Sequence, residues 1–472
     1  MFLLLLIHLL IGIAILLSGD RLGRRAFVVA ALAPLATLMW AATQWSTVVG
    51  NPSEFDELSH ASSAGAQFES VRWISDLDLD LYLRFDAFAL IMTLLVSGIG
   101  LLVCIYSVGY FSHIKPGQSR LAGLMTLFAA AMLGIVWADH LIALFIAWEL
   151  TSITSYLLIG NDDRNPRARA AALQAIFITG AGGLALLVGL GIIGQSAGTY
   201  RLSELINSPP SGSAVAAALV CILLGAFTKS AQAPFSSWLP GAMVAPTPIS
   251  AYLHSATMVK AGVYLVARLS PIVANTGHWR LFVLVVGSAT MLIGGLRAMR
   301  QRDLKLLLAY GTVSQLGFMM LLVGTGEYKI AQAGIVLLLA HGAFKATLFM
   351  LVGIIDHQVG TRHIRELHGF GNGWMPVKAM AVIGAASMAG MPPLLGFVAK
   401  EKAIDAYLEY GDFAGSSATL VVIIAGSVLT FAYSARFVLG VFGAYGTPDH
   451  EVHSRSAPAP SAIFVAPAAV LT

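Results

Sequence analysis

The stretch Ala226-Phe227-Thr228-Lys229-Ser230-Ala231-Gln232-Ala233-Pro234-Phe235 decides how this chain folds, because it places a charge and a proline inside an apolar segment. A lysine at such a depth costs about 2.5–3.5 kcal/mol even on permissive membrane-insertion scales. Pro234 has no backbone N–H to donate, so we expect the helix to break close to Lys229. Broken helices with an ionisable group at the break mark the ion path in many transporters. The alternative is a kinked helix whose lysine snorkels to one membrane interface.

The composition of the chain indicates an integral membrane protein. Of its 472 residues, 57% are hydrophobic and only 11% are charged, whereas a soluble domain carries about 25% charged residues. The net charge of +4 does not indicate nucleic-acid binding, because the basic residues lie in short loops between apolar runs. The sequence has no P-loop, no HExxH motif and no zinc or disulfide spacing of its two cysteines. Nothing in it indicates a soluble catalytic site or a cofactor.

Apolar segments of about 20 residues recur along the chain, long enough to cross a bilayer. We therefore predict an all-α membrane protein with about 14 transmembrane helices, two of them broken. The last helix begins near Ser461 and stops at Thr472, which suggests a fragment of a longer subunit. The earlier spans are 1–18, 26–42, 85–111, 121–137, 141–160, 168–194, 214–243 (broken), 249–269, 281–299, 304–323, 330–355, 377–410 (broken) and 414–443.

Residues 48–82 interrupt this series with a polar and acidic segment. We expect an external loop there. Within it, the alternation Asp76-Leu77-Asp78-Leu79-Asp80-Leu81 predicts a short strand or hairpin, because side chains of a strand point alternately to opposite faces.

Basic residues in alternate loops predict the orientation in the membrane. The loops after odd-numbered spans hold most of them, and the positive-inside rule places these loops in the cytoplasm and the N-terminus outside. The first span has no basic residue ahead of it, so it is expected to be an uncleaved helix rather than a secretory signal. The arginines and lysine of the odd loops are Arg21, Arg24, Arg25, Lys115, Arg120, Arg164, Arg167, Arg169, Arg297, Arg300, Arg302, Arg362 and Arg365.

A second proline break, at Gly390-Met391-Pro392-Pro393-Leu394, lies five spans after the first and is followed by Lys400. An odd number of spans between matched breaks predicts two units that run in opposite directions through the bilayer, an inverted repeat. We therefore divide the chain into four parts. These are three N-terminal helices with the external loop (1–111), a first five-helix repeat (112–271), a second five-helix repeat (272–443), and a loop with the start of a truncated helix (444–472).

Glu149 lies about ten residues into its span, or about 15 Å deep at 1.5 Å per residue, near the membrane midplane. Ser152, three residues on, shares its helix face. An alternative role for Glu149 is a static ion pair that holds helices together.

The span that opens with Pro246-Thr247-Pro248 carries His254 and Lys260. Lys260 is about 240° round the helix from His254, so we expect the two side chains to face different neighbours. A lone intramembrane histidine is also compatible with simple hydrogen-bonded packing.

His341 and Lys345 lie four residues apart on one helix face in mid-span, an arrangement suited to proton transfer. Asp303 and Lys305, by contrast, open a helix at its cytoplasmic end, where we expect a solvated role. Asp139 and His140 similarly cap a span. The intramembrane series predicted to carry protons is Glu149, Lys229, His254, Lys260, His341, Lys345 and Lys400.

Several of these segments resemble the antiporter-like subunits, the family that includes the Mrp sodium/proton antiporters and the large membrane subunits of respiratory complex I. The likeness covers nearly the whole chain and is strongest to the MrpA type within that family. It is carried by Trp148-Glu149-Leu150-Thr151-Ser152, Ile178-Thr179-Gly180-Ala181-Gly182-Gly183-Leu184, Lys229 to Phe235, Pro246 to Lys260, Asp303-Leu304-Lys305, Thr312 to Gly317, His341 to Lys345, and Val352 to Arg362.

The resemblance implies a fourteen-helix core in which Glu149 and Lys229 form a charge-switched pair. It further implies that His254 or Lys260, then His341 and Lys345, act as the central relay, and that Lys400 is the terminal lysine. Proteins of the MrpA type are longer than this chain.

We therefore expect a subunit of a multisubunit Na⁺/H⁺ antiporter of the plasma membrane that works with other subunits and is not itself an enzyme. The alternative is a proton-pumping membrane subunit of a complex I-like oxidoreductase. A passive helical scaffold is a third hypothesis.

Overall fold

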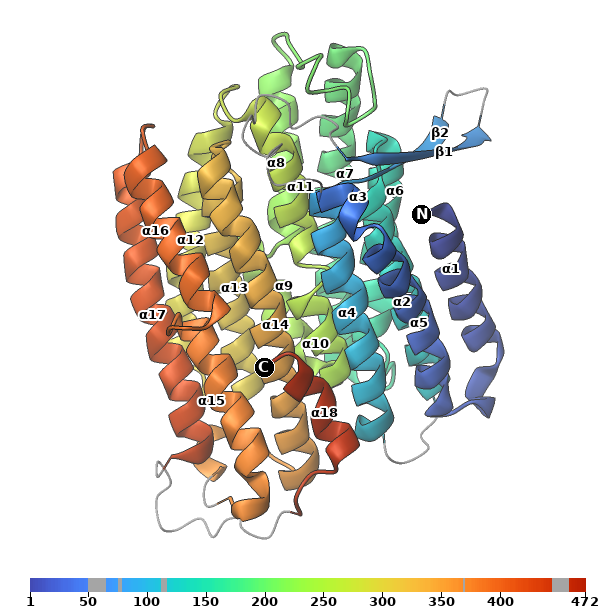
Figure 1. Cartoon of the computed structure of the whole chain (residues 1–472), viewed down its shortest axis with the longest axis vertical. Helices are drawn as coiled ribbons and strands as arrows, with labels where there is room; N and C mark the ends of the chain where they lie inside the picture. Colours follow the sequence, from blue (N-terminus) through green and yellow to red (C-terminus); the bar gives the residue numbers. More distant parts are fainter. Residues whose placement is uncertain (50–64, 75–78, 112–116, 368–369, 444–457) are drawn as a thin grey trace.

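The protein is a bundle of long helices with a β-hairpin at one end, as the computed structural model in Figure 1 shows. The structure describes residues 1–49, 65–74, 79–111, 117–367, 370–443 and 458–472. Within these residues, ten helical segments are long and apolar enough to cross a membrane. They are α2 (Arg25–Thr43), α4 (Ala87–Tyr110), α5 (Gln118–Trp137), α6 (Leu141–Ile159), α7 (Pro166–Ala197), α10 (Thr247–Ser255) together with α11 (Lys260–Val273), α12 (Trp279–Met299), α13 (Leu304–Val323), α14 (Tyr328–Val359) and α17 (Ser416–Phe442).

Shorter helices complete the bundle. Three of them are apolar and match predicted spans or half-spans, namely α1 (Phe2–Leu17), α8 (Val215–Lys229) and α15 (Met375–Ala389). The remaining helices are α3 (Trp45–Val49), α9 (Trp238–Gly241), α16 (Leu395–Tyr410) and α18 (Ala462–Val470). The prediction of a multi-pass helical membrane protein is confirmed.

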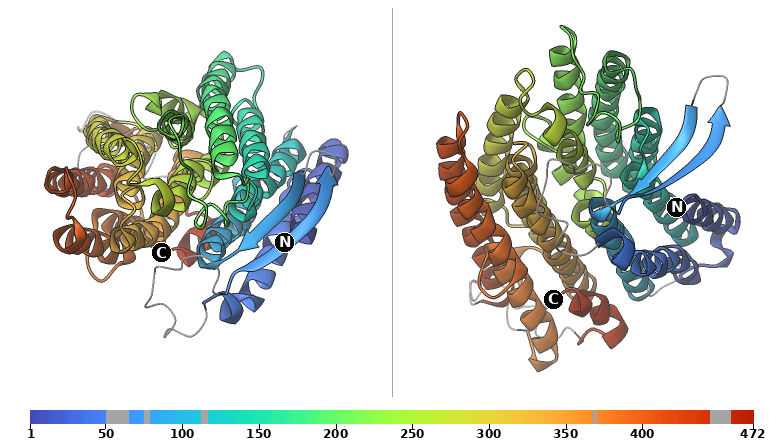
Figure 2. Two further views of the ribbon diagram at one scale, coloured as in Figure 1. Left: turned by 90° about the horizontal axis from the view of Figure 1, so that it is seen from above. Right: turned by 45° about the horizontal axis from the view of Figure 1, so that its top comes forward.

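The hairpin pairs β1 (Gln67–Ile74) with β2 (Leu79–Phe85) in antiparallel register, with Gln67 opposite Phe85. It lies across one end of the bundle, beside the N-terminal helices (Figures 1 and 2). The predicted strand is confirmed from Leu79 onward. Residues 76–78 of the alternating stretch and much of the expected external loop lie outside the described residues.

Contacts between loops join the ends of alternate spans. At one end, the Gly117 amide donates to Asp20 (2.9 Å) and the Ile364 amide donates to the Arg302 carbonyl (2.8 Å). At the other end, the Ser203 amide donates to Asp139 (2.9 Å). If the loops are numbered by the predicted span that precedes them, each contact joins two odd-numbered loops or two even-numbered loops. This is expected if successive helices cross the bilayer in alternate directions.

The first predicted break is present where Lys229 and Pro234 place it. Helix α8 ends at Lys229, and the chain turns before α9 begins at Trp238. The Gln232 amide donates to the Phe227 carbonyl (2.8 Å) and the Trp238 indole donates to the Thr228 carbonyl (2.9 Å). The backbone carbonyls freed by the break are thus satisfied inside the protein, as an interrupted helix in a bilayer requires.

The second break, between α15 and α16, also lies where the sequence predicts it. Helix α15 ends at Ala389, and α16 begins at Leu395 after the two prolines. The Met391 amide donates to the Ala386 carbonyl (3.0 Å), which closes the end of α15.

A third interruption separates α10 from α11, so the expectation of one continuous helix over 249–269 was wrong. No proline or glycine marks residues 256–259. Instead, the Thr257 hydroxyl donates to the Tyr252 carbonyl (2.9 Å), and the Ser230 hydroxyl donates to the Val259 carbonyl (2.8 Å). Hydrogen bonds that compete with the helix ladder therefore hold the chain open between His254 and Lys260.

Candidate functional site

Lys229, the last residue of α8, is buried in the bundle. It is 0% exposed, and its Nζ donates to the Trp148 carbonyl (2.8 Å) and the Ser152 hydroxyl (2.7 Å) of α6. The same nitrogen lies 5.0 Å from the centre of the Trp148 ring. A lysine that snorkels to the membrane interface is therefore excluded, and Ser152 does share the face that the sequence predicted.

Glu149 lies next to this lysine but does not bind it directly. No ion pair joins the two side chains within 4 Å in the described part of the chain, although their charges interact. The carboxylate lies against Gly183 of α7, where a Cβ atom would collide with Oε1. That buried oxygen accepts no hydrogen bond from the described residues. Glu149 is thus an unpaired carboxylate near Lys229, not the static ion-pair partner considered from the sequence.

A second group of buried polar side chains lies around the middle of α14. Lys260 of α11 donates to the Leu338 carbonyl (2.9 Å), and its Nζ would lie 3.0 Å from a Cβ at Gly342. Leu338 and Gly342 flank His341, whose two ring nitrogens are buried without a hydrogen bond to the described residues. The charge of His341 interacts with Lys260 and with Lys345. Lys260, His341 and Lys345 therefore form one cluster.

Lys345 continues this cluster toward α13. Its Nζ donates to the Leu308 carbonyl (3.0 Å) and would lie 3.1 Å from a Cβ at Gly311. The aromatic ring of Tyr433 lies equally close to Gly311. The lysine nitrogen therefore faces a polar patch between α13 and α17.

A hydrogen bond from a side chain to the backbone joins the two groups. The Ser230 hydroxyl donates to the Val259 carbonyl (2.8 Å), so the residues that follow Lys229 and precede Lys260 touch. The break in α8 and the break between α10 and α11 therefore lie side by side, and each carries a lysine at its edge.

Lys400 stands apart, at the second proline break. It is 7% exposed, and its Nζ donates to the Ala389 carbonyl at the end of α15 (2.8 Å). Gly390 leaves room for its side chain, since a Cβ there would lie 2.6 Å from the lysine Cδ. Both lysines thus lie near an interrupted helix and donate to a main-chain carbonyl, Lys229 before its break and Lys400 after its break.

His254 does not join either group. Its ring is fully buried between Trp238 (6.2 Å) and Phe349 (6.3 Å), and neither nitrogen bonds to the described residues. The histidine charge interacts with Lys305 instead. The alternative, in which His254 is simply packed and hydrogen-bonded, is not supported, because neither ring nitrogen has a hydrogen-bond partner among the described residues.

Lys305 was expected in a solvated position, and that prediction was wrong. The residue is 1% exposed, and its Nζ donates to the Ala245 carbonyl (2.5 Å). Asp303 does begin α13 as expected, because its carboxylate accepts from the Lys305 and Leu306 amides and pairs with Arg362 (2.5 Å). The chain before α10 folds over the first turn of α13 and covers the lysine.

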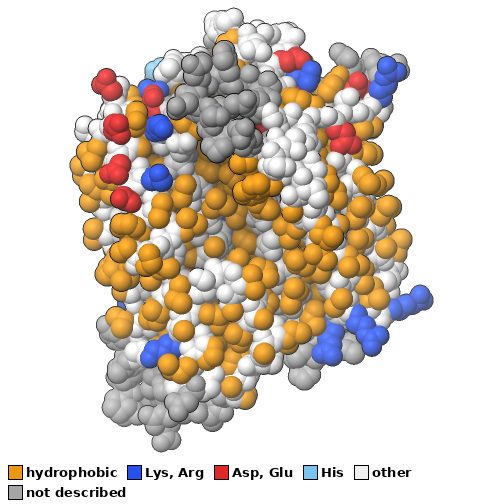
Figure 3. All heavy atoms as spheres, viewed as in Figure 1, with side chains coloured by type: hydrophobic (Ala, Val, Ile, Leu, Met, Phe, Trp, Pro, Cys, Tyr) orange, Lys and Arg blue, Asp and Glu red, His pale blue; other side chains and the backbone are white. Residues whose placement is uncertain are grey.

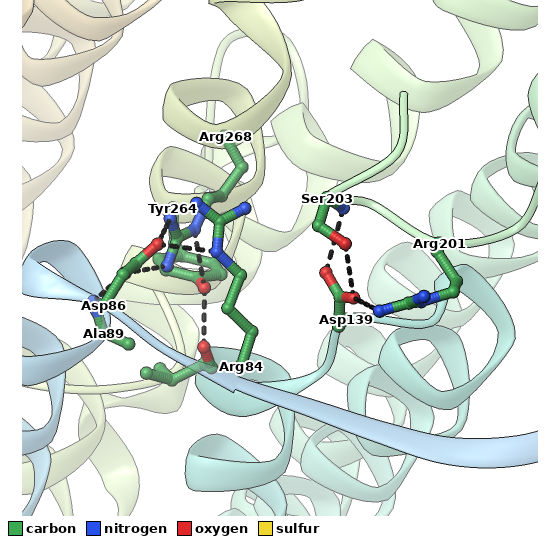
Figure 4. Close-up of polar contacts among 9 residues, drawn as sticks. Arg84, Asp86, Ala89, Asp139, Arg201, Ser203, Tyr264 and Arg268 are labelled. Atoms are coloured by element: carbon green, nitrogen blue, oxygen red, sulfur yellow. Dashed lines mark hydrogen bonds and ion pairs between the residues drawn. The ribbon is translucent and has the colours of Figure 1, made fainter. Parts of the chain in front are cut away.

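An ion-pair cluster outside the predicted series joins α11 to the hairpin. Arg268 donates through both terminal nitrogens to Asp86 (2.6 and 2.7 Å), and Arg84 lies 3.0 Å from the same carboxylate. The Tyr264 hydroxyl accepts from Arg268 (2.8 Å) and donates to the Val136 carbonyl (2.7 Å). Figure 4 shows these side chains pointing toward one another, with the Asp139, Arg201 and Ser203 contacts nearby. A charged residue near the end of an apolar span was the only sequence signal for this cluster.

A buried polar network between α13 and α17 was also missed. Gln315 donates to the Thr430 hydroxyl (3.1 Å) and to the Tyr433 hydroxyl (3.3 Å). Tyr433 in turn lies beside Gly311 and so faces Lys345. Single hydroxyl and amide residues in apolar helices are too common for the sequence to single out these three.

The described residues contain no group of three or more His, Cys, Asp or Glu side chains placed to hold a metal ion. The site is instead made of amines, imidazoles and one carboxylate at membrane depth, all of which can bind and release protons.

Two family descriptions match the sequence. Residues 138–430 match the membrane domain described as "NADH:quinone oxidoreductase/Mrp antiporter, TM", and residues 73–120 match the N-terminus of chain 5 of NADH-ubiquinone oxidoreductase (complex I). The first match spans the candidate residues from Glu149 to Lys400.

Curated relatives carry antiporter names. The chain is 44% identical over 405 residues to a protein of Rhizobium meliloti named as the probable A/B component of a K(+)/H(+) antiporter, covering 83% of this chain and 39% of that protein. It is 40% identical over 426 residues to the A component of a Na(+)/H(+) antiporter of Alkalihalophilus pseudofirmus, covering 85% and 53%. The chain thus spans about half the length, or less, of these relatives.

Solved structures show the same architecture. A chain of the Mrp complex from Dietzia sp. DQ12-45-1b superimposes with a TM-score of 0.85 at 37% identity, covering all of this chain and 49% of that one. A chain of an archaeal membrane-bound sulfane sulfur reductase gives a TM-score of 0.83 at 20% identity, covering 99% and 92%, which shows a common fold alone. The chain therefore belongs to the NADH:quinone oxidoreductase/Mrp antiporter family of membrane proteins and resembles MrpA-type antiporter components over most of its length.

Proposed function

We propose that the chain is the antiporter-like part of an MrpA-type component in a multisubunit monovalent cation/proton antiporter, with Na⁺ and H⁺ as its substrates. It works in transport, together with other membrane subunits, in the plasma membrane. The names of its relatives support this assignment, since they are called subunits of Na(+)/H(+) and K(+)/H(+) antiporters.

Protons pass through the bundle along Lys229, Lys260, His341, Lys345 and Lys400, with Glu149 at the start. One observation carries this route. The four lysines of this route are buried and each donates to a main-chain carbonyl of a neighbouring helix at 2.8–3.0 Å, and none forms an ion pair with the described residues. Such an amine can hold or release a proton without the cost of breaking a buried salt bridge. Of the two alternatives on the α10–α11 span, Lys260 lies on the route and His254 lies beside it.

The pair of Glu149 and Lys229 acts as the gate. In the arrangement seen, the lysine is held by the Trp148 carbonyl and Ser152, and the carboxylate stands free against Gly183. Rotation of protonated Lys229 toward Glu149 would exchange these bonds for an ion pair, and its proton would no longer be available for transfer to Lys260. Entry of a cation near Glu149 would favour the reverse.

The finer architecture is part of this proposal. It comprises 14 transmembrane helices, with inverted five-helix repeats over 112–271 and 272–443, and an external N-terminus. The two proline breaks, each with a lysine bonded to a carbonyl, support the repeat. Hydrogen bonds join odd-numbered loops to odd-numbered loops and even-numbered loops to even-numbered loops. These contacts support helices that cross the membrane in alternate directions.

The test is ion exchange in membrane vesicles that contain the complete antiporter complex. Lys229→Ala and Glu149→Gln variants should assemble normally but lose Na⁺-dependent proton movement, and the same assay with K⁺ identifies the cation. Normal exchange by either assembled variant would remove that residue from the mechanism. Co-purification with iron–sulfur or flavin proteins would instead favour the complex I-like alternative, and unchanged exchange after neutralising all the buried lysines would favour a passive scaffold.

A further inference from the structure

A cavity of about 370 Å³ opens among α2, α4 and α18, at the end of the bundle where α1 and α2 meet. Two arginines and a serine line it together with aliphatic side chains. They are Arg24, Arg25, Ser461, Val28, Val108 and Ile463. The volume lies within the range of about 300–1,000 Å³ that is usual for ligand pockets. None of these residues belongs to the proposed proton route.

Aromatic contacts hold the three walls of the cavity in place. The rings of Phe27 and Phe111 stack 5.2 Å apart and fix α2 against the end of α4. The rings of Phe464 and Tyr106 stack 4.9 Å apart and fix α18 against the same helix. Gly109 permits this approach, since a Cβ there would lie 3.2 Å from Phe464. These contacts fix α2, α4 and α18 relative to one another around the cavity.

The polar side of the cavity carries two arginines whose charges are not neutralised by ion pairs with the described residues. Arg24 and Arg25 are exposed and form no ion pair with the described residues. Asp20, the nearest acidic residue in sequence, accepts a hydrogen bond from the Gly117 amide instead (2.9 Å). Ser461 precedes α18, and its hydroxyl does not cap that helix. A helix N-terminus and two arginines favour the same ligand, an anion.

The apolar side of the cavity faces the bilayer. Arg25 begins α2, and Val28 lies one turn farther in, about 4.5 Å deeper at 1.5 Å per residue. Val28 and Ile463 are both 55% exposed on the outer surface of the bundle. Figure 3 shows Lys and Arg side chains at this end, directly below a broad belt of hydrophobic side chains. A ligand that fits must therefore be anionic at one end and apolar at the other.

We propose that this cavity binds an anionic phospholipid, with the phosphate held by Arg24, Arg25 and the start of α18, and an acyl chain along Val28, Val108 and Ile463. Basic pockets between helices at a membrane surface bind anionic headgroups in this way. The lipid would join α18 to α2 from the membrane side.

The test is thermal unfolding of the complete complex after delipidation in a neutral detergent. Phosphatidylglycerol should raise the melting temperature in a saturable manner, while phosphatidylcholine and inorganic phosphate should not. Each surface arginine contributes about a fivefold change in lipid affinity, so the Arg24→Gln/Arg25→Gln variant should bind about 25-fold more weakly. Arg21→Gln is the matched control, because Arg21 lies in the same loop but does not line the cavity.

A second variant keeps the test decisive if the double variant does not fold. Val28→Trp fills the apolar side of the cavity at an exposed position and leaves both arginines in place, so it should also weaken the response to phosphatidylglycerol. The proposal would be overturned if phosphatidylcholine raised the melting temperature as much as phosphatidylglycerol does. It would also be overturned if a folded variant responded to phosphatidylglycerol as strongly as the unmodified protein. A response to inorganic phosphate as large as that to the lipid would overturn it in favour of a free-anion site. The readout does not depend on ion exchange, so failure of the transport proposal would leave it unaffected.

Discussion

The side-chain nitrogen of Lys229 lies 2.8 Å from the carbonyl oxygen of Trp148, while the carboxylate of the next residue, Glu149, forms no ion pair with it. The two charges interact across the bundle, and a direct ion pair between them would strengthen that attraction. In the proposed mechanism, this separation is one of the two positions of the gate. Changes to either residue, or to the glycine that faces the carboxylate, should therefore alter ion exchange.

Gly183→Ala should impair exchange although it adds only one methyl group. The new Cβ would collide with Oε1 of Glu149 and push the carboxylate away from α7. We expect exchange to fall by about tenfold or more, because displacement of a reacting group by about 1 Å costs up to about a hundredfold. Exchange is measured in vesicles with Gly180→Ala as the matched control, since Gly180 lies one turn away on α7 with nothing within 4 Å. Equal activity of the two variants would contradict the role of Glu149.

Lys260→Ala should abolish exchange, whereas His254→Leu should retain most of it. Lys260 lies against Gly342 beside His341, while His254 lies between Trp238 and Phe349. Both variants are compared by Na⁺-dependent proton movement at equal assembly. The opposite order of activities would place the route through His254.

Asp86→Asn should destabilise the fold by about 3–5 kcal/mol, because it leaves the bidentate Arg268 without its counter-charge. Burial by itself would raise the pKa of Asp86, but Arg268 and Arg84 outweigh it and hold that pKa well below its usual range. The ion pair therefore contributes fully above the ordinary carboxyl pKa of about 4 and is lost only as the pH falls below it. Unfolding measured between about pH 6 and 9 should show a constant penalty, and a penalty that shrinks within that range would refute this account.

Arg362→Gln should cost much less, about 1 kcal/mol or below. The Arg362 side chain is 33% exposed and its partner Asp303 is 24% exposed, so water screens the pair. The same unfolding experiment compares this variant with Asp86→Asn. A penalty as large as that of Asp86→Asn would show that the loop ion pair is as important as the buried one.

The sequence by itself determined the helical membrane fold, the two proline breaks and the buried charges near them. These features follow from local chemistry, since an apolar run, a missing amide donor and a lysine inside hydrocarbon have the same consequence whatever surrounds them. Glu149, Lys229, His254, Lys260, His341, Lys345 and Lys400 were found in this way.

Only the tertiary structure decided which of these residues meet. The break before Lys260 depends on Ser230, which binds the carbonyl of Val259, 29 residues away in sequence. Because of this break, the angle of about 240° that a continuous helix would set between His254 and Lys260 does not apply. Lys305 is buried because Ala245 covers it, and Asp86 lies 182 residues from Arg268. Hydrogen bonds and ion pairs between distant segments leave no periodic pattern in the chain, because each depends on how separate helices pack.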